Sequence, residues 1–277
     1  MIAPAPQASF RWIDPPCGRA LRCEALAPLA DHLFTTRAWA LGAPSPADLR
    51  GAWGEVASAL RVDEGSLIRL RQIHGSSVLV ARDRADGGAD ADIVVTAEDR
   101  LAVAVQTADC IPVLTADSGS CAVGAAHVGW RGLASRVPAA LVAAMAREFG
   151  SRPSDLIIAA GPSIGPCCYE VGEDVRERFE RELFTNDEMA GWFLKVPAST
   201  PKNPSAARVE RPTRRNHSFF DLWSAVRDQF ASAGVGLRNI HIAELCTASH
   251  PEDFCSYRRD GALAGRMAAA IRCPRSR

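Results

Sequence analysis

The sequence lacks both a long apolar run and an excess of charge of either sign. Its 277 residues carry 32 Lys and Arg against 32 Asp and Glu, so the formal net charge at pH 7 is zero. Attraction to nucleic acid or to a membrane surface through bulk electrostatics needs a net positive charge, and we expect neither partner. No apolar run approaches the roughly 20 residues of a membrane-spanning helix.

Paired-cysteine motifs are also missing, although the chain has nine cysteines. Without a CxxC pair, it has neither a zinc ribbon nor a thioredoxin-type motif. The odd number and the adjacent Cys167 and Cys168 fit poorly with a disulfide framework. Residues 1–12 show no basic segment followed by an apolar one. We therefore expect no signal peptide, a cytoplasmic location and reduced thiols.

The common phosphate-binding motifs are absent as well, since neither GxxxxGK(S/T) nor GxGxxG occurs. The segment GPSIGP at residues 161–166 has prolines that favour a rigid turn lining a pocket. We expect Cys246, Cys255, Tyr257 and Arg258 to line the same pocket, with thiols that are buried and not reactive.

Apolar periodicity predicts alternating strands and helices. The expected helices are 46–60, 133–149, 173–183 and 219–233. The expected strands are 32–36, 67–72, 77–81, 92–96, 101–106, 111–115, 121–126, 155–160 and 239–243. Residues 263–272 form a last element whose type the pattern leaves open. The pattern indicates a mixed α/β or α+β fold, and the consecutive strands over 67–126 argue against a simple doubly wound sheet.

Two segments carry little periodicity. Residues 1–30 are rich in Ala and Pro, and we expect a loose or partly extended lead-in. Residues 196–216 are polar and proline-rich, which predicts an insertion or mobile loop.

Three side chains with metal-binding or nucleophilic chemistry stand at the ends of predicted strands: His74, Cys110 and His127. Two imidazoles and one thiolate form a suitable zinc shell that leaves a fourth position open, as catalytic zinc sites do. Two other interpretations stay open. Cys110 could be a nucleophile with His127 as its base, or all three could be satisfied core residues.

Three polar neighbours are candidates for substrate contacts. Arg131 offers a planar set of donors for an anionic oxygen. Asp109 could orient a ligand or act as an acid or base, and Gln72 could contact a substrate amide. For each of them the alternative is a structural contact at a turn or a strand end.

Several motifs occur together in one order and resemble the YfiH-like family, also called the polyphenol oxidoreductase laccase or purine nucleoside phosphorylase family. They are RQIHG, ADIVVT, QTADCIPVL, AAHVGWRG, GPSIGPCCYEVG and the C-terminal CT, FCSYRRDG and GR segments. The resemblance covers roughly residues 30–272. It implies a single catalytic domain over 31–277, similar in fold to the catalytic domain of cytotoxic necrotizing factor, with mixed sheets flanked by helices.

The resemblance also implies zinc held by His74, Cys110 and His127, with copper as a possible substitute. It implies phosphorolysis of adenosine, inosine and methylthioadenosine, together with adenosine deamination. The expected partners are therefore a purine nucleoside and phosphate. Laccase chemistry ranks low, because six histidines and no HxH pair cannot assemble a multicopper centre.

Two rival functions follow from the same residues. One is a cysteine hydrolase or amidase that uses Cys110 and His127 to edit cell-wall precursors. The other is a zinc-stabilised binding or regulatory module without catalysis, which an open three-ligand set argues against.

Overall fold

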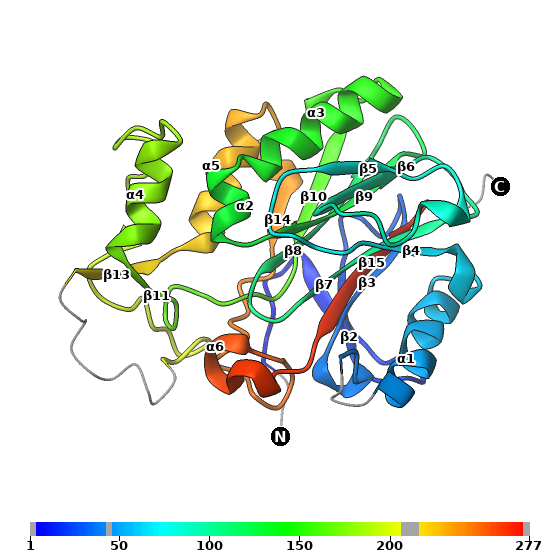
Figure 1. Ribbon diagram of the computed structural model, residues 1–277, viewed down its shortest axis with the longest axis horizontal. Helices are drawn as coiled ribbons and strands as arrows, with labels where there is room; N and C mark the ends of the chain where they lie inside the picture. Colours follow the sequence, from blue (N-terminus) through cyan, green and yellow to red (C-terminus); the bar gives the residue numbers. More distant parts are fainter. Residues whose placement is uncertain (1–3, 43–45, 206–215, 274–277) are drawn as a thin grey trace.

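Two six-stranded mixed sheets pack face to face at the centre of the molecule (Figure 1). The computed structural model describes residues 4–42, 46–205 and 216–273. The first sheet has the order β1 (Phe10–Ile13), β2 (Ala20–Cys23), β3 (Asp31–Thr35), β15 (Met267–Arg272), β7 (Ala102–Thr107) and β4 (Leu67–Arg69). The second has the order β14 (Ile240–Ile242), β10 (Leu156–Ala160), β8 (Ile111–Asp117), β9 (Val123–Val128), β6 (Ile93–Thr96) and β5 (Val78–Val80).

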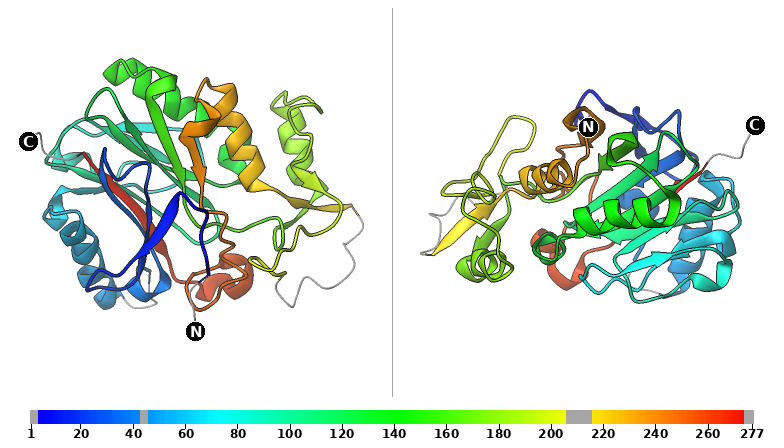
Figure 2. Two further views of the ribbon diagram at one scale, coloured as in Figure 1. Left: turned by 180° about the vertical axis from the view of Figure 1, so that it is seen from behind. Right: turned by 90° about the horizontal axis from the view of Figure 1, so that it is seen from above.

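Helices cover the two outer faces and complete a layered α/β arrangement (Figure 2). Helix α1 (Pro46–Ala59) packs Trp53 and Val56 on the first sheet. The second sheet is covered by α2 (Trp130–Ala134), α3 (Val137–Phe149) and α5 (Leu222–Ser232). Between the sheets lies a separate apolar core that includes Val103, Leu114 and Ile271. The mixed α/β fold class is confirmed.

A small third sheet lies beside these layers, with the strand order β11 (Glu170–Gly172), β13 (His217–Phe220) and β12 (Phe193–Leu194). Helix α4 (Glu173–Arg181) continues from β11 (Figure 1). Phe179 on this helix packs among aromatic rings. The short helix α6 (Tyr257–Asp260) lies at the lower edge of the molecule in Figure 1. Within the described residues, no helix combines the length and apolar character that a membrane span requires.

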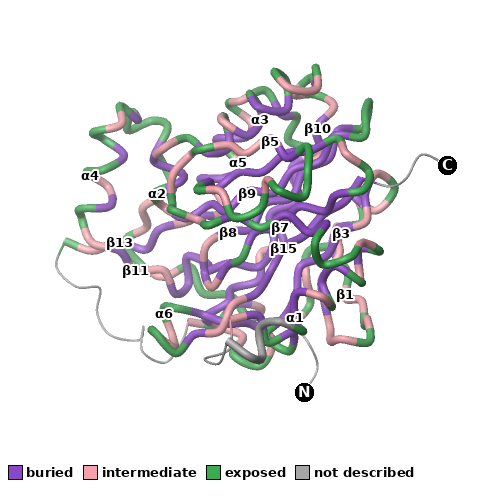
Figure 3. Tube along the Cα trace, turned by 45° about the vertical axis from the view of Figure 1, so that its right-hand side comes forward, coloured by how far each residue is buried: buried purple, intermediate pink, exposed green. Residues whose placement is uncertain are grey.

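The predicted run of buried strands is confirmed. Every residue of β8 and β9 is buried, which Figure 3 shows as continuous purple through the centre. Both faces are covered because one side of this sheet meets the first sheet and the other meets helices. The predicted helix at 46–60 is also present as α1, over Pro46–Ala59.

Two predicted helices differ from the structure. The segment 133–149 is broken between α2 and α3, because Arg136 takes a left-handed conformation with φ of 56°. The helix expected from Phe219 begins at Leu222, since Phe219 and Phe220 pair in the small sheet. The C-terminal element is strand β15, inserted between β3 and β7.

The N-terminal segment is more ordered than the expected lead-in. It contributes β1 and β2, and β2 pairs with β3 in the first sheet. Of the loop predicted to be mobile, residues 206–215 lie outside the described residues, so its mobility stays a prediction. Residues 196–205 form no helix or strand, but Asn203 is buried and donates a hydrogen bond to the backbone oxygen of Glu244 at 2.8 Å.

Candidate metal centre and active site

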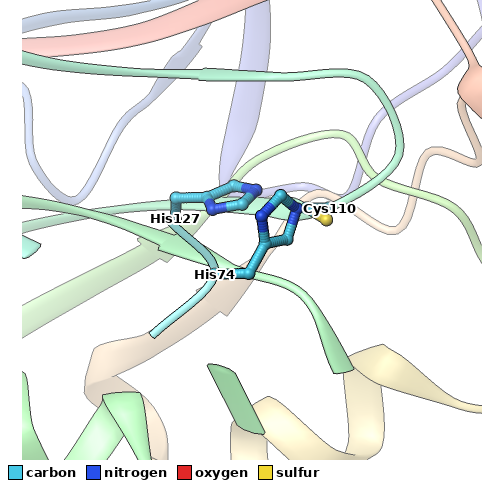
Figure 4. A group of neighbouring side chains, drawn as sticks. All are labelled: His74, Cys110 and His127. Atoms are coloured by element: carbon cyan, nitrogen blue, oxygen red, sulfur yellow. The ribbon is translucent and has the colours of Figure 1, made fainter. Parts of the chain in front are cut away.

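His74, Cys110 and His127 converge on one point (Figure 4). One ligand atom from each lies within 4.8 Å of the others. His74 comes from the loop between β4 and β5, Cys110 from the turn between β7 and β8, and His127 from β9. His74 is exposed, Cys110 is half-buried and His127 is buried. The group is therefore accessible to solvent on the side of His74.

Strand register explains this convergence. In the β8–β9 pair His127 lies opposite Pro112, so it stands next to the turn that carries Cys110. In the β6–β9 pair Ala126 lies opposite Ile93, which places Asp92 beside His127. His74 reaches the same point from a loop residue with a left-handed φ of 61°.

Asp92 holds two parts of this group together. Its Oδ1 accepts a hydrogen bond from Nδ1 of His127 at 2.8 Å. Its Oδ2 accepts from the backbone amides of Ile73 at 3.1 Å and Gly75 at 2.7 Å, on either side of His74. Because a carboxylate can only accept, Nδ1 carries a proton, and Nε2 of His127 is the nitrogen that would bind a metal once the imidazole is neutral.

Gly129 leaves room for the thiol. A Cβ at this position would lie 2.7 Å from Sγ of Cys110 and 3.9 Å from Cδ2 of His74. Its φ of −93° is ordinary, so the need for glycine here is steric and not conformational.

Electrostatics favour the charged forms of the pair Cys110 and His127. Burial alone would raise the pKa of Cys110, but the charges and hydrogen bonds of His127 and His74 lower the pKa to about 6. Burial alone would lower the pKa of His127, but the Cys110 thiolate and Asp92 raise the pKa to about 9. Without metal, the two side chains therefore form a thiolate–imidazolium pair near neutral pH.

A cavity of about 480 Å³ opens onto the group, and its wall includes His74, Cys110 and His127. It adjoins a second hollow of about 970 Å³. Both are lined by Trp130, Arg131, Tyr169 and Arg258. This volume is in the range of small-molecule sites.

The predicted Arg131 contributes an exposed positive charge to this cavity. Its guanidinium carbon lies 4.3 Å from the centre of the Trp130 ring, and it makes no ion pair with any other described residue. Arg131 is therefore available to an anionic ligand.

The predicted Gln72 and Asp109 also line this cavity, but their polar atoms are engaged. The side-chain amide of Gln72 donates to the backbone oxygen of Gln106 at 2.8 Å and accepts from its amide at 2.7 Å. Asp109 accepts from the hydroxyl of Thr247 and from the amide of Arg258, both at 2.6 Å. Their roles in substrate binding stay predictions.

The donor set fits a metal ion. Two imidazoles and a thiolate suit zinc, and they also suit a single copper. The carboxylate behind His127 is the usual partner of a metal-bound histidine. Asp92, Gly129 and Tyr169 were not among the predicted site residues. For Asp92 the signal was its place at the start of the apolar ADIVVT segment, where a carboxylate is buried.

Comparisons with other proteins identify relatives of this chain. A family model described as "Multi-copper polyphenol oxidoreductase laccase" matches residues 44–274. A purine nucleoside phosphorylase of Deinococcus radiodurans is 33% identical over 256 residues, covering 88% of this chain and 89% of that protein. Adenosine deaminase RL5 from an unknown prokaryotic organism is 31% identical over 227 residues, covering 78% of each chain.

The fold has a solved counterpart. The crystal structure of Bacillus licheniformis hypothetical protein YfiH superposes with a TM-score of 0.80 and 26% identity. The superposition covers 96% of this chain and 99% of that one.

Proposed function

The chain belongs to the multi-copper polyphenol oxidoreductase laccase family, and on that basis we propose that it is a zinc-dependent purine nucleoside phosphorylase with adenosine deaminase activity. The proposed substrates are adenosine, inosine and methylthioadenosine, with phosphate. Relatives named as purine nucleoside phosphorylase and adenosine deaminase support the reaction class. The observation that carries the proposal is the convergence of His74, Cys110 and His127 on a cavity that also holds Arg131.

His74, Cys110 and His127 would hold the metal. Zinc in such a set supplies a Lewis acid that polarises a phosphate oxygen or lowers the pKa of water. Copper could occupy the same three ligands, but one such site cannot supply laccase chemistry that needs several coppers. The chain's own residues prepare the site in advance, since Asp92 fixes the orientation of His127 before any ligand binds.

In phosphorolysis, a phosphate oxygen bonds to the anomeric carbon of ribose, and the bond from that carbon to the purine breaks. The purine leaves with the bonding electrons and takes up a proton. Arg131 binds the phosphate, and Trp130 and Tyr169 supply aromatic walls for the nucleoside. We propose Asp109 as the proton donor, since burial raises the pKa of its carboxyl although Thr247 and Arg258 donate hydrogen bonds to it.

In deamination, water adds to C6 of adenine and ammonia leaves. The reacting atom is then C6 and not the ribose carbon bonded to the purine, so the nucleoside must bind in a different orientation in the same cavity. Phosphate is not consumed in this reaction. The two activities can therefore be separated by omitting phosphate.

The test measures products from metal-analysed protein. Adenosine with phosphate should give adenine and ribose 1-phosphate, and adenosine without phosphate should give inosine. Cys110→Ala should abolish both activities and reduce bound zinc. Cys121→Ala removes an exposed thiol from the turn between β8 and β9 and serves as the control. Unchanged adenine release by Cys110→Ala would overturn the proposal.

A cysteine amidase acting on cell-wall precursors is the second candidate. The low pKa of Cys110 and the Asp92–His127 hydrogen bond favour it, because they match a nucleophile, its base and an orienting carboxylate. An amide substrate would leave an acyl group on Cys110 that mass spectrometry detects. Loss of all activity on chelation, with no adduct, would exclude this candidate.

A further inference from the structure

A second cluster of thiols lies apart from the first group. The sulfur atoms of Cys167, Cys168 and Cys246 lie within 4.8 Å of one another, and all three residues are buried. None of them is a member of the His74, Cys110 and His127 group. We propose that these three cysteines form a second metal site, one that binds monovalent copper.

Hydrogen bonds fix the backbone that carries the cluster. Ser163 and Cys246 form a parallel bridge, which brings the segment 161–168 alongside the chain after β14. The amide of Cys246 donates to Oδ1 of Asn203 at 2.9 Å. Two adjacent cysteines on one segment and a third on the other therefore face one point before metal binds.

Polar groups accompany the sulfurs inside an otherwise apolar core. The amide of Gly165 donates to Sγ of Cys246 at 3.3 Å. The hydroxyl of Ser249 lies 3.4 Å from Sγ of Cys167 and 3.5 Å from Sγ of Cys168. The Gly165 amide offsets the negative charge of a thiolate, as outer-shell partners do in metal sites. The Ser249 hydroxyl donates to the backbone oxygen of Pro204 at 2.6 Å and so ties that segment to the cluster.

The ligand set selects the metal. Soft thiolates favour monovalent copper, zinc and iron–sulfur clusters. Structural zinc takes four nitrogen or sulfur ligands, whereas this cluster offers three sulfurs with a serine hydroxyl beside them. Three ligands about 2.3 Å from one metal lie about 4 Å apart, which the cluster allows.

The cluster also has an entry path. Cys168 and Ser249 line the hollow of about 970 Å³ that adjoins the first cavity. Each thiol that coordinates releases a proton, so copper affinity falls as pH falls.

Thr247 links the two metal groups through the chain. It follows Cys246, and its hydroxyl donates to Asp109, which precedes Cys110. The two sites nevertheless share no ligand, so their metals can be removed independently. That independence makes the proposal testable.

The test titrates monovalent copper into anaerobic, reduced protein against a chromophoric copper chelator. Cys110→Ala, which disables the first group, should retain one equivalent of copper bound to sulfur by X-ray absorption. In the Cys110→Ala background, a second substitution, Cys246→Ala or Cys168→Ser, should abolish binding of this copper equivalent. Cys23→Ala in the same background removes a buried thiol outside both groups and should leave copper binding unchanged.

Ser249→Ala should keep all three ligands and weaken copper binding about tenfold. This variant keeps the proposal testable if a cysteine variant does not fold. Loss of all copper in Cys110→Ala would overturn the proposal, and so would copper retained after both Cys168 and Cys246 are replaced. A Cys168–Cys246 disulfide that forms in place of copper binding would also overturn it.

Discussion

Asp92 and His127 form a buried carboxylate–imidazole pair, with 2.8 Å between Oδ1 and Nδ1. The other oxygen of Asp92 accepts from the amides that flank His74. One carboxylate thus orients His127 and anchors the loop that carries His74.

Replacing Asp92 by Asn should weaken metal binding by about 10–100-fold, the usual cost of losing such a partner. An asparagine side chain has only one acceptor oxygen. It can therefore accept a hydrogen bond from His127 or from the amides of Ile73 and Gly75, but not from both. Competition with a zinc chelator measures the change. Asp117→Asn is a matched control, because Asp117 is a buried carboxylate that accepts from Ser151 away from the site. Equal metal affinity in the two variants would contradict a role specific to Asp92.

Gly129→Ala should displace Cys110 without removing any ligand. The added Cβ would lie 2.7 Å from Sγ, so the thiol must move out of its present position. We expect lower zinc content and activity with nearly unchanged thermal unfolding. Gly236→Ala adds the same methyl group where nothing lies within 4 Å, so it should leave both unchanged. A zinc-replete, active Gly129→Ala variant would show that the site has room to adapt.

Sequence reasoning found the buried strands and the three converging side chains, because strand ends carry functional residues whatever the topology. It did not find Asp92 as their partner. The contact depends on the register between β6 and β9, which joins residues far apart in the chain. A single sequence shows that an acidic residue begins an apolar strand, but not which side chain it faces.

The elements that sequence reasoning missed depend on tertiary pairing. Strand β15 contains Ala268, Ala269 and Ala270, which favour a helix when isolated. It is a strand because β3 and β7 pair with it on both sides. The break at Arg136 did have a signal in the sequence, because Pro138 lies in the first turn of α3, where proline is tolerated, and not in a helix interior.

Cys110 should react with iodoacetamide as a thiolate in chelator-treated protein. With its pKa lowered to about 6, the thiolate is present above that pH and is lost as pH falls through it. At pH 7 we expect alkylation about two- to threefold faster than for a thiol of ordinary pKa, because the larger thiolate fraction is partly offset by the lower nucleophilicity of a low-pKa thiolate. His127→Ala removes the positive partner and should move the profile to higher pH. Cys110→Ser gives the background from other cysteines, and a midpoint near pH 8.5 in the unmodified protein would contradict the expected pair.

Arg131→Gln should raise the KM for phosphate by about tenfold or more, because a charged hydrogen bond contributes about 1.5–3 kcal/mol. Arg131→Lys keeps the charge but loses the planar set of donors, so its effect should be smaller but present. Phosphate-independent deamination of adenosine should change little in either variant. Arg147→Gln, on the exposed side of α3, is the control. An equal loss of both activities would assign Arg131 to the nucleoside and not to phosphate.

His32 should make the fold sensitive to mild acid. It is buried in β3, where Nε2 accepts from the amide of Cys23 at 2.9 Å and Nδ1 donates to the backbone oxygen of Ala30 at 3.0 Å. Burial lowers the pKa of this imidazole to about 4, against about 6.5 in the unfolded chain.

The unfolded chain therefore takes up the proton first as pH falls. The stabilisation from neutral His32 is complete above pH 6.5 and declines towards pH 4, by about 3 kcal/mol in all. His32→Gln keeps an acceptor for Cys23 and cannot titrate. Urea unfolding at several pH values should show a shallower loss of stability in this variant than in the unmodified protein. Parallel profiles would mean that His32 does not remain neutral in the folded state.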